Sequence, residues 1–237
     1  MTTTYDVAIV GAGIVGAACA AALAEAGARV ITLDPARPGG GATAEGMGHI
    51  VVMDDSEAQF ALTHRSQVLW DALDLPAAAE RTGSGTIWVA TNERENEEVL
   101  RKHREYEARD VPTEVLDQTA LLTAEPNLTP RATGGLLVPG DSVVYPPVVA
   151  EWLLEQAAAR GAAQRLGARV TGVGSNLVHF VTDGHAEQIG CKQVVLAAGI
   201  ATLDLLPTPI TGLAIRPRKG HLLITDRYPG FCNHQLI

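Results

Sequence analysis

The first 34 residues show a change of hydrophobic pattern from strand to helix and back to strand. Residues 5–10 form a β-branched apolar run, and residues 14–26 are rich in alanine and other helix formers. Gly27 is placed to end this helix, and residues 28–34 again have the character of a strand. This order predicts a βαβ unit, in which two parallel strands are joined by a helix.

Three glycines stand at the junction between the first strand and the helix. Gly11 permits a tight turn, Gly13 lets the backbone approach a pyrophosphate, and Gly16 lets the helix pack close to the strand. The start of the helix offers unpaired N–H groups and a positive dipole end to phosphates. Asp34, at the end of the second strand, is placed to accept hydrogen bonds from an adenosine ribose. A glycine triplet alone also occurs in ordinary strand-to-helix turns, but the complete order predicts dinucleotide binding by a Rossmann-like fold.

The apolar run in the first 34 residues could also indicate a transmembrane helix. Residues 7–24 contain no charge over 18 positions, which is about the minimum for a spanning helix. Glycine and alanine dominate the run, and no positively charged segment precedes it. We therefore expect neither a transmembrane segment nor a secretion signal.

Further elements follow along the chain. Their patterns predict strands at residues 49–53, 85–91, 113–116, 135–138, 167–173, 177–182 and 194–196. Helices are expected from the cap at Ser56 to residue 73, at 92–110, at 119–124, and from Pro146 to Gly161. The helix at 92–110 is highly charged and has only Val99, Leu100 and Tyr106 to bury, so we expect it on the surface.

The order of these elements predicts an α/β fold of two parts. Residues 1–84 and 143–211 together form one discontinuous domain with a parallel sheet. Residues 85–142 form an α+β insertion, which residues 212–237 join. At the end of the strand at 194–196, the small residues Ala197, Ala198 and Gly199 allow close backbone approach at the sheet edge where ligands bind, although a simple turn explains them equally well.

Composition narrows the choice of partners. The 237 residues carry a net charge of −9 and no cluster of lysine or arginine, so we expect no nucleic acid and no anionic membrane as partner. The 46% of hydrophobic residues and a mean hydropathy of +0.11 fit a globular protein. Cys19, Cys191 and Cys232 are far apart and lack ligand-like histidine spacing, which favours a reducing, cytoplasmic location without a metal site.

Six segments, in this order, resemble the glycine and D-amino acid oxidase family of FAD-dependent oxidoreductases, which includes sarcosine oxidases and amino acid dehydrogenases. They are VAIVGAGIVG with Asp34, GGGATAEGMGHI, GDSVVYPPVVAEWLLEQAAARGA, ARVTGV, VVLAAGIAT and IRPRKGHLLIT. The βαβ fingerprint serves both FAD and NAD, whereas the early loop ATAEGMGH resembles flavoproteins. The resemblance implies that residues 1–84 and 143–211 are the FAD-binding domain and that the remainder belongs to a substrate domain.

The resemblance also implies a set of cofactor-binding residues. The glycines and Asp34 would bind the ADP half of FAD, the loop at 42–49 would pass beside the pyrophosphate and the isoalloxazine, and Val170 would contact the adenine through its backbone. The full set is Gly11, Gly13, Ile14, Val15, Gly16, Asp34, Pro35, Ala42, Thr43, Ala44, Gly46, Met47, Gly48, His49, Val170, Ala197, Ala198 and Gly199. The Thr43 hydroxyl can donate to a phosphate oxygen.

The implied reaction oxidises the C–N bond of an amino acid or secondary amine, such as glycine, sarcosine, proline or a D-amino acid. The flavin takes a hydride from the carbon that bears the amine, so no acid/base pair of side chains is obligatory. His49 is the candidate catalytic residue, because it can hydrogen-bond the flavin or tune its electronics, although a histidine at the start of a strand is often structural.

Family members continue beyond the last segment that matches, whereas this chain ends in FCNHQLI, which has the pattern of a strand interior. We therefore expect a fragment or one piece of an assembly, whose last strand pairs in an oligomer or with a partner chain. Three functions stay open: an FAD-dependent amine or amino acid oxidoreductase, a non-catalytic FAD-binding fragment or subunit that needs a partner chain, and a NAD-dependent dehydrogenase.

Overall fold

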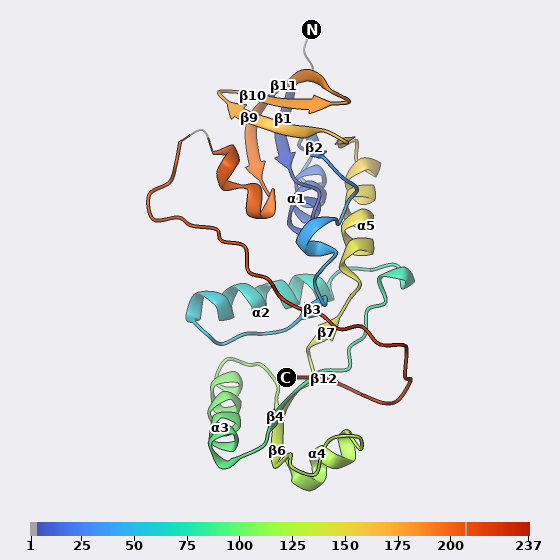
Figure 1. Cartoon of the computed structure of the whole chain (residues 1–237), viewed down its shortest axis with the longest axis vertical. Coiled ribbons are helices and arrows are strands. Elements are labelled where there is room, and N and C mark those ends of the chain that lie inside the picture. The colour runs from blue at the N-terminus through green and yellow to red at the C-terminus, as the bar shows by residue number, and fades with distance from the viewer. Residues whose placement is uncertain (1–3, 207) are drawn as a thin grey trace. The chain divides into compact units, whose positions relative to one another are not determined.

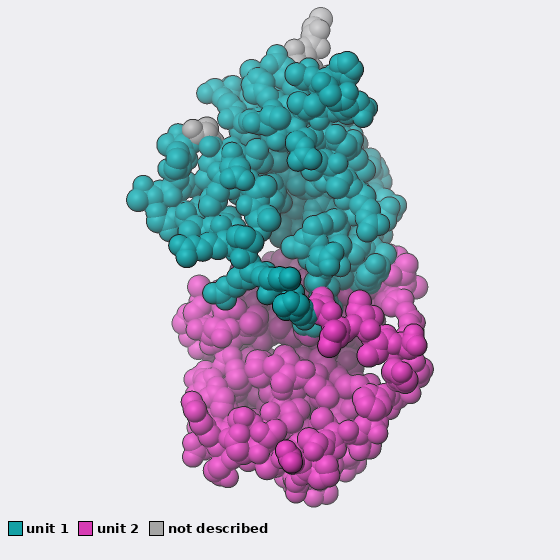
Figure 2. Space-filling view, in the orientation of Figure 1, with its two compact units in different colours: residues 1–47, 145–221 teal, residues 48–144, 222–237 magenta. Residues whose placement is uncertain are grey.

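The computed structural model describes residues 4–206 and 208–237. The chain divides into two compact units (Figure 2): unit 1 contains residues 1–47 and 145–221, and unit 2 contains residues 48–144 and 222–237. Residues 48–84, which the sequence pattern places with the first domain, lie in unit 2. The reason is pairing between segments distant in the sequence, since β3 (His49–Ile50) forms its ladder with β7 (Ser142–Val143).

Unit 1 is built on a six-stranded sheet with the order β8-β2-β1-β11-β10-β9 (Figure 1). Strands β8, β2, β1 and β11 are parallel, and β10 runs antiparallel to both β11 and β9. The bounds are β1 Thr4–Val10, β2 Val30–Asp34, β8 Ala163–Leu166, β9 Arg169–Gly174, β10 Leu177–Thr182 and β11 His185–Leu196. The predicted α/β class with a parallel-rich sheet is confirmed.

Strand β11 is much longer than the strand predicted at 194–196. Residues 185–190 pair with β10, and residues 190–196 pair with β1. The first half of β11 is polar and has no apolar alternation, so its pattern does not indicate a strand. Strand β8, which the sequence pattern did not predict, forms in the same way, because its four residues pair with β2.

Helices α1 (Ile14–Glu25) and α5 (Pro146–Ala159) pack side by side in unit 1 (Figure 1). Helix α1 ends where Gly27, with φ +84°, turns the chain toward β2. Its buried positions are all glycine or alanine: Gly16, Ala17, Ala20 and Ala24. Helix α5 buries Val149, Ala150, Leu153, Leu154 and Ala157, a stripe with helical spacing. In residues 4–206 and 208–237, no helix combines the length and apolar character needed to cross a membrane.

Unit 2 contains a four-stranded sheet with the order β12-β4-β6-β5 and the short β3-β7 pair. The strands of the larger sheet are β4 Thr86–Ala90, β5 Glu114–Asp117, β6 Gly134–Val138 and β12 Gln235–Leu236. The α-helices of unit 2 are α2 Glu57–Asp71, α3 Glu93–Glu107 and α4 Gln118–Ala124. Their N-termini are capped by the side chains of Ser56, Asn92 and Asp117, respectively. The chain also forms 3₁₀ turns η1 Gly41–Thr43, η2 Ala77–Ala79, η3 Gly199–Ala201 and η4 Leu203–Leu205.

The charged helix α3 buries a lysine instead of one of the predicted apolar residues. Val99 and Tyr106 are buried as predicted, but Leu100 is 47% exposed. Lys102 is buried because its ammonium pairs with the Asp54 carboxylate and lies 4.3 Å from the centre of a tryptophan ring. Positions 99, 102 and 106 share one face of the helix, whereas position 100 points about 100° away.

Asp141 is a buried carboxyl group between the elements of unit 2. It is 1% exposed, and its Oδ1 accepts a hydrogen bond from Gln67 Nε2 at 3.2 Å and from the Val52 N–H at 3.4 Å. Burial disfavours the charged form and raises the pKa of Asp141 to about 6. The folded protein therefore binds this proton more tightly than the unfolded chain does.

We expect Asp141→Asn to remove one pH-dependent contribution to stability. Because the pKa is raised in the folded state, the contribution is complete below about pH 4 and is lost as the pH rises through about 6. The difference from an ordinary carboxyl pKa corresponds to roughly 3 kcal/mol. Urea unfolding at pH 4 to 8 should show the parent losing about that much free energy relative to the variant. Parallel pH curves for the two proteins would contradict this prediction.

Candidate functional site

A cavity of about 780 Å³ lies in unit 1 at the carboxyl ends of the parallel strands. Its walls come from the turn between β1 and α1, the end of β2, the loop at 40–43, the start of β9 and the segment at 197–205. Twelve of the residues predicted to bind a cofactor line this one cavity: Gly11, Gly13, Ile14, Val15, Asp34, Pro35, Ala42, Thr43, Val170, Ala197, Ala198 and Gly199. Segments far apart in the sequence therefore meet at the sheet edge where open α/β sheets bind ligands.

Backbone hydrogen bonds join the ends of these strands. The Gly11 N–H donates to the Leu33 carbonyl at 2.8 Å, and the Ala197 N–H donates to the Val10 carbonyl at 2.8 Å. The turn after β1 is thus held between the ends of β2 and β11, its two neighbours in the sheet. This arrangement fixes the start of α1 at the cavity wall.

Two of the three glycines are required by contacts within the chain. Gly11 has φ +113°, and a Cβ there would lie 2.3 Å from the Ala197 carbonyl oxygen. A Cβ on Gly16 would lie 1.9 Å from the Gly11 carbonyl oxygen, and Gly16 does not line the cavity. Real Cβ atoms do not approach oxygen so closely, so these glycines maintain the packing of the turn.

Gly13 differs from the other two glycines. Its φ of −69° suits any residue, and a Cβ would meet only the Thr43 hydroxyl oxygen, at 3.1 Å. Gly13 lines the cavity, so a larger side chain would project into that space. Its lack of a side chain is therefore explained by the space beside it rather than by the backbone.

Thr43 connects the loop at 40–43 to the start of α1. Its hydroxyl oxygen accepts a hydrogen bond from the Ile14 N–H at 3.0 Å. The oxygen is the acceptor in this bond, so the hydroxyl proton is available to a ligand. Ile14 is the first residue of α1, where N–H groups lack partners within the helix.

Asp34 is held by the backbone on both sides. Its Oδ2 accepts a hydrogen bond from the Ala12 N–H at 2.7 Å, and its Oδ1 accepts one from the Ala36 N–H at 2.7 Å. Each carboxylate oxygen can accept a further bond, so the side chain can receive ribose hydroxyl groups in this orientation. The Ala12 contact also ties the end of β2 to the glycine turn.

Several predicted residues lie outside the cavity wall. Gly16, Ala44, Gly46 and Met47 belong to unit 1 but do not line the cavity. Gly48 and His49 belong to unit 2, where the His49 side chain is exposed in β3. The proposed role of His49 near a flavin stays a prediction.

A family model described as DAO, FAD dependent oxidoreductase, matches residues 6–236. The chain belongs to this family. Glycine oxidase from Geobacillus kaustophilus is 30% identical over 235 residues, which are 94% of this chain and 62% of that protein. Hydrogen cyanide synthase subunit HcnC from Pseudomonas aeruginosa is 28% identical, over 98% of this chain and 67% of that protein.

Solved structures of the DAO family agree with this fold. The crystal structure of glycine oxidase from Geobacillus kaustophilus matches with a TM-score of 0.74 and 28% identity. The match covers 86% of this chain and 58% of that one. The chain thus spans about three fifths of the length of the glycine oxidase that it resembles.

The cavity also has lining residues that sequence reasoning missed. They are Val10, Leu33, Ala36, Gly40, Gly41, Arg169, Ala201, Asp204 and Leu205. Ile200, which the resemblance placed with Ala197, Ala198 and Gly199 against the cofactor, also lines the cavity. Gly40 and Gly41 stand in the glycine-rich segment GGGATAEGMGHI, so the sequence pattern indicated this loop but not these two wall residues. Asp204 and Leu205 form part of η4, a 3₁₀ turn without a periodic signal that could reveal its place.

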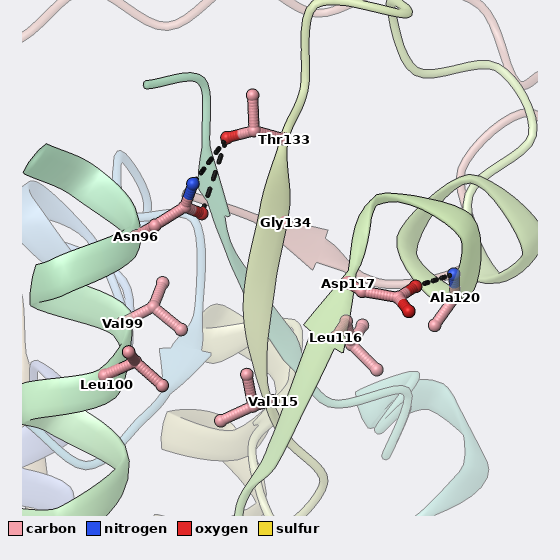
Figure 3. A pocket seen from close by; sticks show the side chains of 9 residues that line it. All are labelled: Asn96, Val99, Leu100, Val115, Leu116, Asp117, Ala120, Thr133 and Gly134. Atoms are coloured by element: carbon pink, nitrogen blue, oxygen red, sulfur yellow. Dashed lines mark hydrogen bonds between the residues drawn. The ribbon is translucent and has the colours of Figure 1, made fainter. Parts of the chain in front are cut away.

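A smaller pocket of about 350 Å³ lies in unit 2 between α3, β5 and β6 (Figure 3). Val99 and Leu100 extend from α3 toward Val115 on β5. Its polar side chains bond to the chain itself: Asn96 pairs with Thr133, and Asp117 accepts from the Ala120 N–H at 2.8 Å. The cavity of unit 1 is therefore the better candidate for a functional site.

We expect Gly16→Ala to destabilise the protein, because the added methyl group would displace the Gly11 carbonyl. Overpacking of this kind costs about 3 kcal/mol in free energy of unfolding. Gly172→Ala on β9 is the matched control, since a Cβ there meets nothing within 4 Å. Urea unfolding should show a large loss for the first variant and a change below about 0.5 kcal/mol for the second. Equal stability of the two variants would contradict the close packing at Gly16.

Proposed function

We propose that this chain binds FAD in the cavity of unit 1 and acts as an FAD-dependent oxidoreductase. The proposed reaction oxidises the C–N bond of an amino acid or secondary amine of the glycine, sarcosine, proline or D-amino acid type. The observation that carries the proposal is the cavity that joins the glycine turn, Asp34 and Val170. Its volume of about 780 Å³ falls within the range of cofactor and small-molecule sites.

The pyrophosphate of FAD would lie at the start of α1. The first turn of α1 contains no acidic residue, so no fixed negative charge there opposes a phosphate. The helix dipole and N–H groups attract the anion, and Gly13 leaves room for it. The Thr43 hydroxyl, whose oxygen already accepts the Ile14 N–H, would donate its proton to a phosphate oxygen.

The adenosine of FAD would lie at the end of β2. The Asp34 carboxylate, oriented by the Ala12 and Ala36 N–H groups, would accept hydrogen bonds from the ribose. Val170, at the start of β9 beside the end of β2, would contact the adenine through its backbone. The residues present thus suit both the charged and the neutral parts of the ADP group.

When bound, FAD supplies a hydride acceptor for the carbon that bears the amine of the substrate. The residues of this chain would hold the cofactor, and the small residues Ala197, Ala198 and Gly199 would let it approach the end of β11. We assign the substrate domain to unit 2 and keep His49 as the candidate that hydrogen-bonds the flavin.

A second candidate function is an FAD-binding subunit that works with a partner chain. Two relatives are described as subunits: HcnC, and an opine oxidase subunit from Rhizobium meliloti, which is 26% identical. The family match favours FAD over the NAD-dependent alternative. Activity of the isolated chain separates the first two functions.

The visible absorbance of the purified chain tests the cofactor and the reaction together. We expect a flavin spectrum for the parent, and bleaching under anaerobic conditions by one member of a panel of glycine, sarcosine, proline and D-amino acids. Gly13→Val should lose the flavin, because its side chain would fill the space for the pyrophosphate. Gly172→Val is the control and should keep it.

Each result points to one conclusion. Flavin retained by Gly13→Val as well as by the parent would contradict the proposed site. Flavin that no member of the panel bleaches would favour the FAD-binding subunit over the oxidoreductase.

Asp34→Asn should weaken FAD binding by about 1.5–3 kcal/mol, which corresponds to roughly 10- to 150-fold in Kd. The amide has one acceptor oxygen, and its NH₂ group would face the N–H of Ala12 or Ala36. Fluorescence titration of the apoprotein with FAD measures the change. An unaltered Kd would show that the Asp34 carboxylate stabilises the glycine turn and does not bind the ribose.

A further inference from the structure

Arg169 places a cation in the wall of the cavity without a partner from the protein. It is the first residue of β9 and precedes Val170, and both residues line the cavity. Within residues 4–206 and 208–237, the Arg169 side chain forms no hydrogen bond or ion pair. Asp34 and Asp204 line the same cavity, yet within the described residues neither carboxylate forms an ion pair with Arg169, and the Asp34 oxygens accept the Ala12 and Ala36 N–H groups instead. The guanidinium group is therefore free to contact a ligand.

Backbone contacts place Arg169 beside the end of β2. The Ala168 N–H donates to the Asp34 carbonyl oxygen at 3.0 Å, so the chain enters β9 directly next to Asp34. Gly13 and Thr43, the residues proposed to bind the pyrophosphate, lie instead at the start of α1. Arg169 thus belongs to the part of the wall assigned to adenosine.

The chemistry of the guanidinium group indicates which part of the adenosine Arg169 would contact. A guanidinium is planar and weakly hydrated, and it stacks on aromatic faces. A ribose 2′-phosphate is the other group that an arginine commonly binds at this place in dinucleotide folds. The Asp34 carboxylate would repel such a phosphate, so the uncharged adenine ring is the better target.

We propose that Arg169 stacks on the adenine ring of FAD and thereby selects adenine-bearing flavins over FMN. This inference rests on the proposed function, because it assumes that FAD occupies the cavity. Arg169 acts in binding and takes no part in the chemistry of the flavin ring. A cation stacked on an aromatic ring changes the dissociation constant by about 3- to 30-fold.

The test compares Arg169→Met with Arg165→Met in the full chain. Methionine keeps an apolar side chain of similar length but lacks the positive charge and the planar guanidinium group. Arg165 on β8 is a matched control, since it is exposed in the same unit and does not line the cavity. FAD and FMN are titrated by fluorescence into each apoprotein, and adenosine is used as a competitor of FAD.

We expect Arg169→Met to weaken binding of FAD and of adenosine by the same factor, about 3- to 30-fold, and to leave FMN binding unchanged. Arg165→Met should bind all three as the parent does. An unchanged Kd for FAD, an equal loss for FMN, or an unchanged adenosine competition would each overturn the assignment to adenine. Failure of the parent itself to bind FAD would instead overturn the proposed function.

Discussion

The close packing of the turn after β1 is the constraint on which the rest of unit 1 depends. The Gly11 carbonyl touches the start of α1 where Gly16 has no side chain, and the Ala197 carbonyl touches Gly11 from the other side. Three segments of the chain thus meet without room for one additional carbon atom. Because these contacts are so close, the start of the helix and the end of β11 have fixed places at the cavity, and the Gly11 N–H holds the end of β2 beside them through the Leu33 carbonyl.

In the proposed function, the polar groups of the cavity serve both the fold and the ligand. The Asp34 carboxylate accepts two backbone N–H groups and still has lone pairs for a ribose. The Thr43 hydroxyl accepts the Ile14 N–H and still has a proton for a phosphate. Side chains that are already hydrogen-bonded are oriented before the ligand arrives, which lowers the entropy cost of binding. The site is therefore largely preorganised by the contacts that also hold the turn.

The glycines show that one motif can combine different physical requirements. Gly11 and Gly16 are required by contacts between backbone atoms, whereas Gly13 borders empty space and has an ordinary φ. A sequence pattern treats the three positions alike, but their substitutions should affect stability and binding separately. Arg169 shows the opposite case: it lies within the matching segment ARVTGV, but only the structure shows that its side chain belongs to the residues that line the cavity.

The sequence by itself determined the elements that depend on local physics. The βαβ unit, the cap at Ser56 and the helix stop at Gly27 follow from periodicity, capping and backbone freedom within a few residues. The sequence also indicated twelve of the residues that line the cavity of unit 1, and their role in binding a cofactor stays a prediction. Tertiary structure alone decided the polar half of β11, the strand β8 and the burial of Lys102, because pairing partners and ion partners distant in the sequence stabilise them. The same reason explains the cavity wall, whose residues come from five segments that are distant in the sequence and meet only in the folded structure.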